Sequence, residues 1–196
     1  MQILKTGKPL GVVCAASELS PEGLALLSPE LDAPAFVERL VEEQNFADAI
    51  AFLSHALPTR EAVWWAWLCA RDAVGDAPAP AVAGALAAIH AWIADPSDLH
   101  RRGALDAAQP AGFTTAVGCT ALAVFLTGDT LGPATAPPAP PGEYAAAKAI
   151  AGAVHLAATT EPIPDLSARY TTFVQRGLEL ANRIQLWSPP AASGGR

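Results

Sequence analysis

Hydrophobic positions recur every three or four residues along most of the chain, the spacing of an α-helix that buries one face. The stripe is clearest in the last long segment, which runs from about residue 165 to 186. It consists of Leu166, Tyr170, Phe173, Val174, Leu178, Ala181 and Ile184. Similar spacing predicts further helices over about 34–44, 46–57, 59–75, 79–94, 97–108, 114–127 and 143–159. The pattern therefore predicts an all-α fold.

Capping residues mark where several of these helices begin. The tripeptide Ser-Pro-Glu occurs at 20–22 and again at 28–30, with Ser suited to the N-cap, Pro to the first turn and Glu to the helix dipole. The segments that follow are short, so the first predicts a helix of one or two turns and the second little more than a turn. Asn45, with Asp48 three residues later, predicts another N-cap, and Ser97 a further one.

The organisation along the chain follows from these elements. Residues 1–33 are expected to form an extended N-terminal arm and the short capped helices. Residues 34–186 are expected to form the helical domain, and the fold is expected to be a single compact bundle of about seven or eight helices. The proline-rich loop 132–142 cannot be regular helix and predicts a semi-rigid strap. Residues 187–196 are predicted to be a disordered tail.

Charge and composition exclude several classes of partner. The net charge is −7, the only lysines are Lys5, Lys8 and Lys148, and the nine arginines are scattered along the chain. A protein that binds nucleic acid or an anionic membrane surface needs a concentrated basic surface. The sequence shows none, so both kinds of partner are disfavoured. No run approaches the roughly 18 apolar residues of a membrane span, so no membrane insertion is expected. The cysteines show no CxxC spacing, which fits a reducing compartment, and we predict a cytoplasmic protein.

Three of the five tryptophans fall within the segment TREAVWWAWLCAR, residues 59–71. At 100° per residue, large side chains cover one broad arc of this helix. They are Arg60, Glu61, Trp64, Trp65, Trp67, Leu68 and Arg71. The opposite face is small and suits close approach of another helix, either 79–94 or 143–159. It consists of Ala62, Ala66, Cys69, Ala70 and Ala73. Each arginine lies four residues from a tryptophan, so both guanidinium groups are expected to stack on indole rings.

The arc has three interpretations. It can be the main core, with arginines at its edges; a partly exposed tryptophan–arginine patch, a composition typical of protein interfaces; or a platform for a cofactor. For the second interpretation the candidate partner-binding residues are Arg60, Trp64, Trp67 and Arg71. The sequence does not decide among the three.

Catalytic and ligand-binding motifs are missing from the sequence. The histidines form no HExxH or ExxH pattern, and no nucleophile or phosphate-binding motif occurs. Asp95, Asp98 and His100 crowd one helix junction, but helix capping accounts for both carboxylates. We therefore predict no catalytic residue, no metal ligand and no cofactor.

Two stretches carry a resemblance to a known family. FADAIAFLSHALPTREAVWWAWLCAR (46–71) and YAAAKAIAGAVHLAAT (144–159) resemble an uncharacterised bacterial family of small helical proteins, a domain of unknown function. The resemblance implies a link to gene neighbourhoods of type VI secretion or related contractile injection systems. It implies no catalytic residues.

These observations lead to one expected function and two alternatives. The expectation is a non-enzymatic protein-interaction component, an accessory, adaptor or chaperone-like protein of a secretion assembly, whose partners are secretion-apparatus or effector proteins. The first alternative is an immunity protein that neutralises a co-encoded toxin, for which small acidic helical domains are suited. The second is a small-molecule or metal-dependent enzyme that uses His100 or His155.

Overall fold

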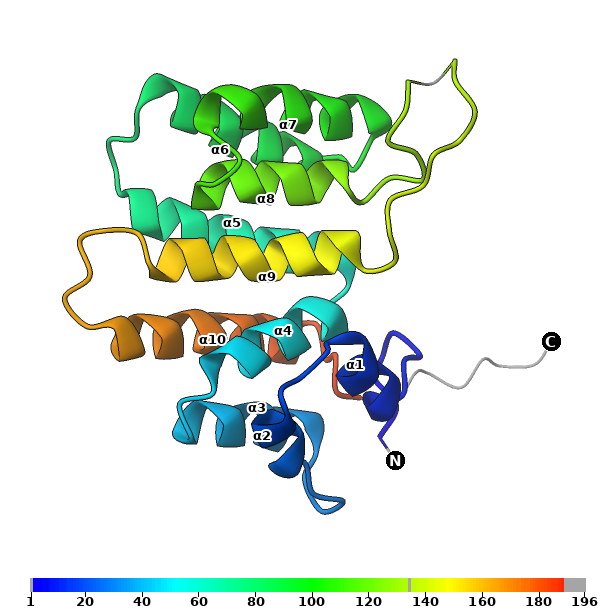
Figure 1. The fold of residues 1–196 in the computed structure, drawn as a ribbon, viewed down its shortest axis with the longest axis vertical. Coiled ribbons are helices and arrows are strands. Elements are labelled where there is room, and N and C mark those ends of the chain that lie inside the picture. The colour runs from blue at the N-terminus through cyan, green and yellow to red at the C-terminus, as the bar shows by residue number, and fades with distance from the viewer. Residues whose placement is uncertain (1, 134, 189–196) are drawn as a thin grey trace. The chain divides into compact units, whose positions relative to one another are not determined.

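The computed structural model describes residues 2–133 and 135–188, which form ten α-helices (Figure 1). Apart from one isolated bridge between Ile3 and Pro9, these residues hold no β-structure. The predicted all-α class is confirmed. None of the described helices is both long and apolar enough to cross a membrane.

The residues group into two compact units. The first, here the terminal unit, comprises residues up to Pro58 and from Tyr170 onward; the second, the central unit, is Thr59–Arg169. The hydrophobic periodicity predicts neither boundary, because it shows which face of a helix is buried but not which helix covers that face.

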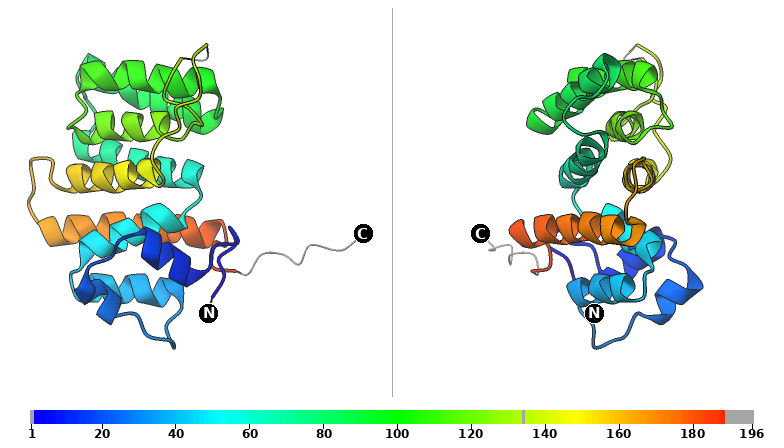
Figure 2. Two further views of the ribbon diagram at one scale, coloured as in Figure 1. Left: turned by 45° about the vertical axis from the view of Figure 1, so that its right-hand side comes forward. Right: turned by 90° about the vertical axis from the view of Figure 1, so that its left-hand side faces the viewer.

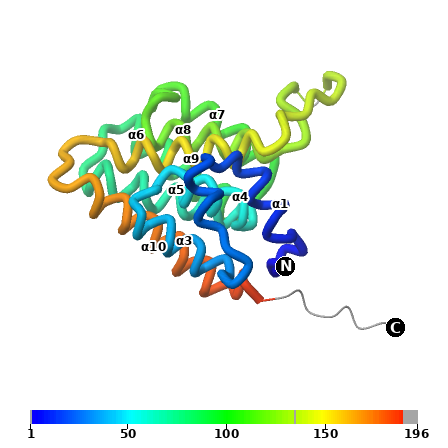
Figure 3. Tube along the Cα trace, turned by 60° about the horizontal axis from the view of Figure 1, so that its bottom comes forward, coloured from blue at the N-terminus to red at the C-terminus, as the bar shows by residue number. Residues whose placement is uncertain are grey.

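The terminal unit is built from the four N-terminal helices and most of the last one (Figure 3). They are α1 (Leu10–Ala16), α2 (Pro21–Ala25), α3 (Ala33–Glu42), α4 (Phe46–Ala56) and α10 (Leu166–Arg183). Both α1 and α3 pack against α4. Phe36 and Phe52 meet edge to face at 5.5 Å, and Phe46 stacks on Tyr170 at 5.2 Å. The first pair is fully buried and lies in the core of the unit, whereas the rings of the second pair are half-buried at its edge.

The extended N-terminal arm is wrong for residues 10–16, which are helical. Pro9 is the N-cap of α1, and its fixed φ of −64° leads directly into the helix. Leu10, Val13 and Cys14 are buried at helical spacing. This short run satisfies a helical pattern as well as a strand pattern, and packing against α4 selects the helix.

The helix caps of the terminal unit converge on one buried carboxylate. Ser20 and Asn45 are the N-caps of α2 and α4, as predicted. Asp48, which is 6% exposed, accepts hydrogen bonds from the Ser20 backbone amide (3.0 Å), the Ser20 hydroxyl (2.5 Å) and the Asn45 side-chain amide (2.7 Å). The sequence predicts each cap separately. The structure shows that a single side chain joins the two helix starts.

Of two predicted segments near the helix ends, one agrees with the structure and the other does not. The second Ser-Pro-Glu, at 28–30, forms only a turn, as expected from the short segment after it. Trp187 lies in the turn after α10 and donates its indole N–H to Asn182 Oδ1 at 2.8 Å. The predicted disordered tail therefore does not begin at 187, and its remainder, residues 189–196, lies outside the described residues.

The central unit stacks five helices (Figures 1 and 2). They are α5 (Thr59–Val74), α6 (Pro80–Ala94), α7 (Asp98–Ala111), α8 (Ala116–Phe125) and α9 (Ala145–Ala158). The closest packing joins α8 to α9 and to α7, α6 to α7, and α5 to α9. Small side chains at these contacts allow the helix axes to approach closely. The Cys119 thiol, for example, donates to the carbonyl of Ala149 on α9 at 3.4 Å.

The proline-rich loop between α8 and α9 projects from the central unit (Figure 2). Its base is closed by the Leu131 amide, which donates to the Ala139 carbonyl at 2.7 Å, and by the Ala139 amide, which donates to Thr130 Oγ1 at 3.0 Å. The described residues of 132–142 contain no helix, as predicted. The predicted strap is thus a loop that closes on its own base.

The turn between α7 and α8 leaves no room for a side chain at Gly118. A Cβ atom there would lie 2.0 Å from the backbone oxygen of Gly112, whose own φ is +84°. Thr115 caps α8 and accepts a hydrogen bond from the Gly118 amide at 3.1 Å. Replacing Gly118 therefore requires the backbone of the turn to move.

We expect Gly118→Ala to lower the free energy of unfolding by about 2–3 kcal/mol, because overpacking against backbone is not relieved by a rotamer change. Gly84→Ala on α6 is the matched control: no atom lies within 4 Å of its Cβ. That change should raise stability by about 0.5–1 kcal/mol, as Ala favours a helix interior. Urea denaturation measures both variants, and equal effects would contradict the close contact.

Candidate functional site

The tryptophan arc of α5 divides between core and surface. Trp65 is fully buried, together with Ala62, Ala66 and Ala70 of the small face, whereas Trp64 and Trp67 are half-buried. The sequence predicted that Trp65 shares one arc with Trp64 and Trp67, and this placement is wrong, because Trp65 lies in the core. The reason is angular: Trp65 lies 100° from Trp64 and 200° from Trp67, so packing of α5 against α9 and α8 places it inside.

Four of the other large side chains of the arc form a line that we name the Trp–Arg stripe. It consists of Arg60, Trp64, Trp67 and Arg71, the four candidate partner-binding residues. Their spacing of four, three and four residues keeps them on one side of α5. Contacts with α6 hold Arg60 and Trp67 of the stripe.

Trp67 is the most firmly fixed member of the stripe. Its indole N–H donates to the Leu86 carbonyl of α6 at 3.0 Å, and its ring centre lies 5.4 Å from the ring of His90. The Arg71 guanidinium carbon lies 4.7 Å from the same indole centre, which confirms the predicted stacking. Arg71 is exposed, so this cation–π contact occurs at the surface.

Arg60 makes a different contact from the one predicted. Its Nε donates to the Ile93 carbonyl at 2.6 Å and its Nη2 to the Ala94 carbonyl at 3.4 Å, at the C-terminal end of α6. The last carbonyls of a helix lack partners within the helix and carry partial negative charge, which favours a cation there. Arg60 therefore binds the last carbonyls of α6 in place of the expected stack on Trp64.

A pocket of about 300 Å³ opens beside the stripe. It is lined by Arg60, Glu61, Trp64, His90, Ile93 and Ala94. The indole of Trp64 and the side chain of Ile93 provide apolar walls, while Arg60 and Glu61 bring opposite charges to the pocket. This volume lies at the small end of the range of ligand pockets and suits one or two apolar side chains.

A second, more polar hollow of about 450 Å³ also includes Arg60. Arg101, which is 4% exposed, lies in its wall and donates to Asp98 Oδ1 (2.9 Å from Nε), the Phe125 carbonyl (2.7 Å) and the Thr130 carbonyl (3.2 Å). Gly128 completes this wall, since a Cβ there would lie 2.4 Å from the guanidinium. The buried arginine thereby fixes the end of α8 and the start of the loop.

Arg102 also binds Asp98 and the base of the proline-rich loop. It donates to Asp98 Oδ2 at 2.8 Å and to the Gly132 carbonyl at 2.9 Å, so one carboxylate aligns two guanidinium groups that hold the base of the proline-rich loop. Sequence reasoning missed this role. The available signal was Asp98 placed three and four residues before an arginine pair, which is the spacing of ion pairs on one helix face.

The two arginines hold the pKa of the Asp98 carboxyl below its ordinary value, with the hydrogen bond from Arg102 the largest cause and that from Arg101 the next. A pKa lowered by folding means that the ionised carboxylate stabilises the fold at neutral pH. This contribution is lost as the pH falls below the unfolded value of about 3.9 and through the folded pKa. We expect the wild type to lose more stability than Asp98→Asn between about pH 5 and pH 2. Denaturation at each pH measures this, and equal losses would contradict it.

The histidines considered for catalysis are not gathered into one site. His100 Nδ1 lies 3.1 Å from Ser97 Oγ and 3.3 Å from Asp95 Oδ2, at the N-terminus of α7 that Ser97 caps as predicted. His155 is half-buried on α9, and burial lowers its pKa. In the part of the chain that the structure describes, no three His, Cys, Asp or Glu side chains form a group able to hold a metal ion.

Comparison with known proteins gives one family. The sequence model of a family of unknown function, DUF6931, matches residues 36–181, a range that includes every residue of the stripe and of its pocket. No curated protein and no solved structure matches the chain.

Proposed function

We propose that this chain, which belongs to the family of unknown function DUF6931, is a non-enzymatic protein-interaction module that binds a partner through the Trp–Arg stripe and its pocket. The observation that carries the proposal is the pocket itself. Half-buried aromatic side chains next to arginines, around a hollow that fits a side chain, are the composition and shape of interface hot spots.

Two members of the stripe, Trp67 and Arg60, are held in place before any partner arrives. Trp67 is hydrogen-bonded to Leu86, and Arg60 to the last carbonyls of α6, so both side chains have already lost their rotamer freedom in the free protein. A preorganised surface costs less conformational entropy on association than a mobile one. This supports binding without rearrangement of α5 or α6.

The pocket indicates the chemistry of the partner. An aliphatic or aromatic side chain fills the space between Trp64 and Ile93, and an acidic group beside it approaches Arg60 or Arg71. Arg60 keeps Nη1 for such a contact, because its hydrogen bonds to α6 use Nε and Nη2. The module thus suits a protein segment with one apolar anchor and a neighbouring carboxylate.

The wider setting of the proposal is a bacterial secretion assembly of the type VI kind, in which the chain acts as an accessory, adaptor or chaperone-like component in the cytoplasm. The resemblance of residues 46–71 and 144–159 to a family linked with such gene neighbourhoods supports this setting. The net charge of −7 equally suits the alternative, an immunity protein bound to a basic toxin.

Affinity capture with matched variants tests the proposal. The wild type, the double variant Trp64→Ala/Arg71→Ala and the control Leu99→Ala are used as bait in the native host, and captured proteins are quantified by mass spectrometry. Leu99 is 78% exposed on α7 and does not line the pocket, so its variant removes a comparable surface side chain.

We expect the double variant to remain folded and to lose at least 90% of a protein that wild type and control both retain, as hot-spot losses of about 2 kcal/mol or more imply. A secretion component among the lost proteins favours the adaptor, and a co-encoded toxin favours the immunity protein. A folded double variant that keeps every partner overturns the proposal.

A further inference from the structure

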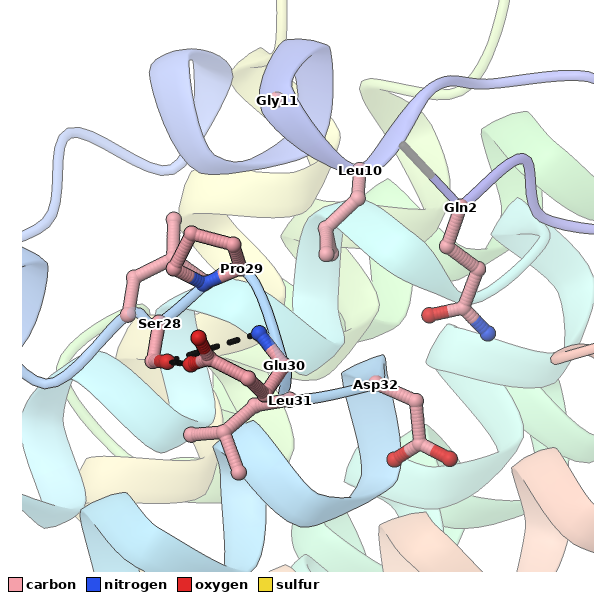
Figure 4. A pocket seen from close by; sticks show the side chains of 9 residues that line it. Gln2, Leu10, Gly11, Ser28, Pro29, Glu30, Leu31 and Asp32 are labelled. Atoms are coloured by element: carbon pink, nitrogen blue, oxygen red, sulfur yellow. Dashed lines mark hydrogen bonds between the residues drawn. The ribbon is translucent and has the colours of Figure 1, made fainter.

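The terminal unit contains a larger groove that the proposed function does not use (Figure 4). It has a volume of about 720 Å³ and runs between the start of α1 and the segment that joins α2 to α3. Figure 4 shows Leu10 on α1 facing Pro29 and Leu31 across the open space. It is lined by Gln2, Leu10, Gly11, Leu27, Ser28, Pro29, Glu30, Leu31 and Asp32.

The walls of the groove are tied together by hydrogen bonds. Gln2 Oε1 accepts from the Ala33 amide at 2.7 Å, and the Gln2 carbonyl accepts from the Leu10 amide at 2.9 Å. Gln2 therefore links the first turn of α1 to the first turn of α3. On the opposite rim the Ser28 hydroxyl donates to the Glu30 carboxylate (Figure 4). The groove is open without any movement of these segments.

Two large aliphatic side chains are also exposed on the helices next to the groove. Val12 on α1 is 50% exposed and Leu24 on α2 is 46% exposed. Large aliphatic side chains scattered singly on a surface are ordinary, and these two do not line the groove, so they serve as controls for the apolar residues that do.

The charges at the groove are of one sign. The ionisable side chains in its lining are Glu30 and Asp32. The nearest lysines along the chain are engaged elsewhere, since Lys5 Nζ donates to the Ile184 carbonyl at 2.7 Å and Lys8 Nζ to the His55 carbonyl at 3.2 Å. An apolar floor with an acidic rim is complementary to an amphipathic segment that carries lysine or arginine.

We infer that the groove is a second docking site, which binds a basic amphipathic helix of a partner protein. Aliphatic side chains one helical turn apart enter between Leu10 and Leu31, and lysine or arginine side chains on the flanks meet Glu30 and Asp32. A second copy of this chain fits less well, because each copy carries a net charge of −7. The inference is independent of the Trp–Arg stripe.

The test uses a fluorescein-labelled amphipathic peptide of leucine and lysine, LKKLLKLLKKLLKL, and the full chain. Fluorescence anisotropy gives its Kd for the wild type and two charge variants. Glu30→Gln/Asp32→Asn removes both carboxylates of the groove, and Asn at 32 still caps α3 as Asp32 does through the Ala35 amide. Glu38→Gln/Glu179→Gln removes two exposed carboxylates of the same unit that do not line the groove.

We expect the groove variant to bind the lysine peptide at least fivefold more weakly than the wild type, and the control variant to differ from the wild type by less than twofold. Leu31→Ser should weaken binding as well, and Leu24→Ser, outside the lining, should not. Removing residues 189–196 should leave the Kd unchanged.

Several results overturn the inference. Equal weakening in both charge variants means general attraction to an acidic chain, and equal binding of the matching leucine–glutamate peptide removes the role of charge. If the lysine peptide does not bind, a basic amphipathic helix is not the occupant of the groove. Dimers that Leu31→Ser dissociates in sedimentation show a second copy in the groove, and binding that appears only after removal of 189–196 shows the chain's own end there.

Discussion

Trp65→Ala is expected to lower the free energy of unfolding by about 3–5 kcal/mol, the range for removing a large aromatic side chain from a closed core. Trp65 is fully buried, and α5 around it packs against α9, α8 and α6. The alanines that line the same side of α5, such as Ala62 and Ala66, cannot extend to fill the space that the indole leaves. The loss therefore includes a cavity as well as the hydrophobic transfer free energy.

The neighbouring tryptophan is the control for this prediction. Trp64 is half-buried beside an open pocket, so Trp64→Ala should cost less than about 1.5 kcal/mol. Urea denaturation, followed by far-UV circular dichroism, compares the two variants directly. If Trp64→Ala costs as much as Trp65→Ala, the division of the arc into core and surface is wrong.

Asp48→Ala is expected to destabilise the terminal unit by a similar amount, about 3–5 kcal/mol. The change removes the shared acceptor of three partly buried donors: the Ser20 backbone amide, the Ser20 hydroxyl and the Asn45 side-chain amide. Each buried donor left without an acceptor costs about 1–3 kcal/mol. A Cβ atom added at Gly23 would lie 1.9 Å from Asp48 Oδ2, so the backbone of α2 lies directly against this carboxylate.

Two further variants make the Asp48 prediction specific. Asp48→Asn keeps one acceptor oxygen and should cost less than Asp48→Ala. Glu38→Ala removes an exposed carboxylate of α3 in the same unit and should change stability by less than about 0.5 kcal/mol. Thermal and urea unfolding measure all three. A small effect of Asp48→Ala would contradict the role of this residue in joining α2 to α4.

Helix positions and caps were predictable because they depend on local spacing. Asn45, Ser97 and Ser20 each have the side chain and following residues of an N-cap, and all three cap the helices expected of them. The α1 helix was missed because its short apolar run fits a strand as well. The two-unit grouping was missed because it depends on which helices pack together, and periodicity carries no such information.

The candidate site was predictable only in part. The spacing of Arg60, Trp64, Trp67 and Arg71 correctly placed the four residues on one side of α5, and the stack of Arg71 on Trp67 followed from it. The contact of Arg60 with α6 did not, because it depends on where another helix ends. The buried Arg101 was equally hidden, since its acceptors Phe125 and Thr130 lie more than twenty residues away along the chain.

The central claim is that a partner protein contacts the pocket between α5 and α6, and site-specific photocrosslinking tests it most directly. A benzophenone amino acid replaces His90, which is exposed and lines the pocket, or Asp106, which is exposed on α7 away from it. After illumination in the native host, we predict a covalent adduct with one protein from position 90 and none from position 106. Adducts with that protein from position 106 and none from position 90 would contradict the claim.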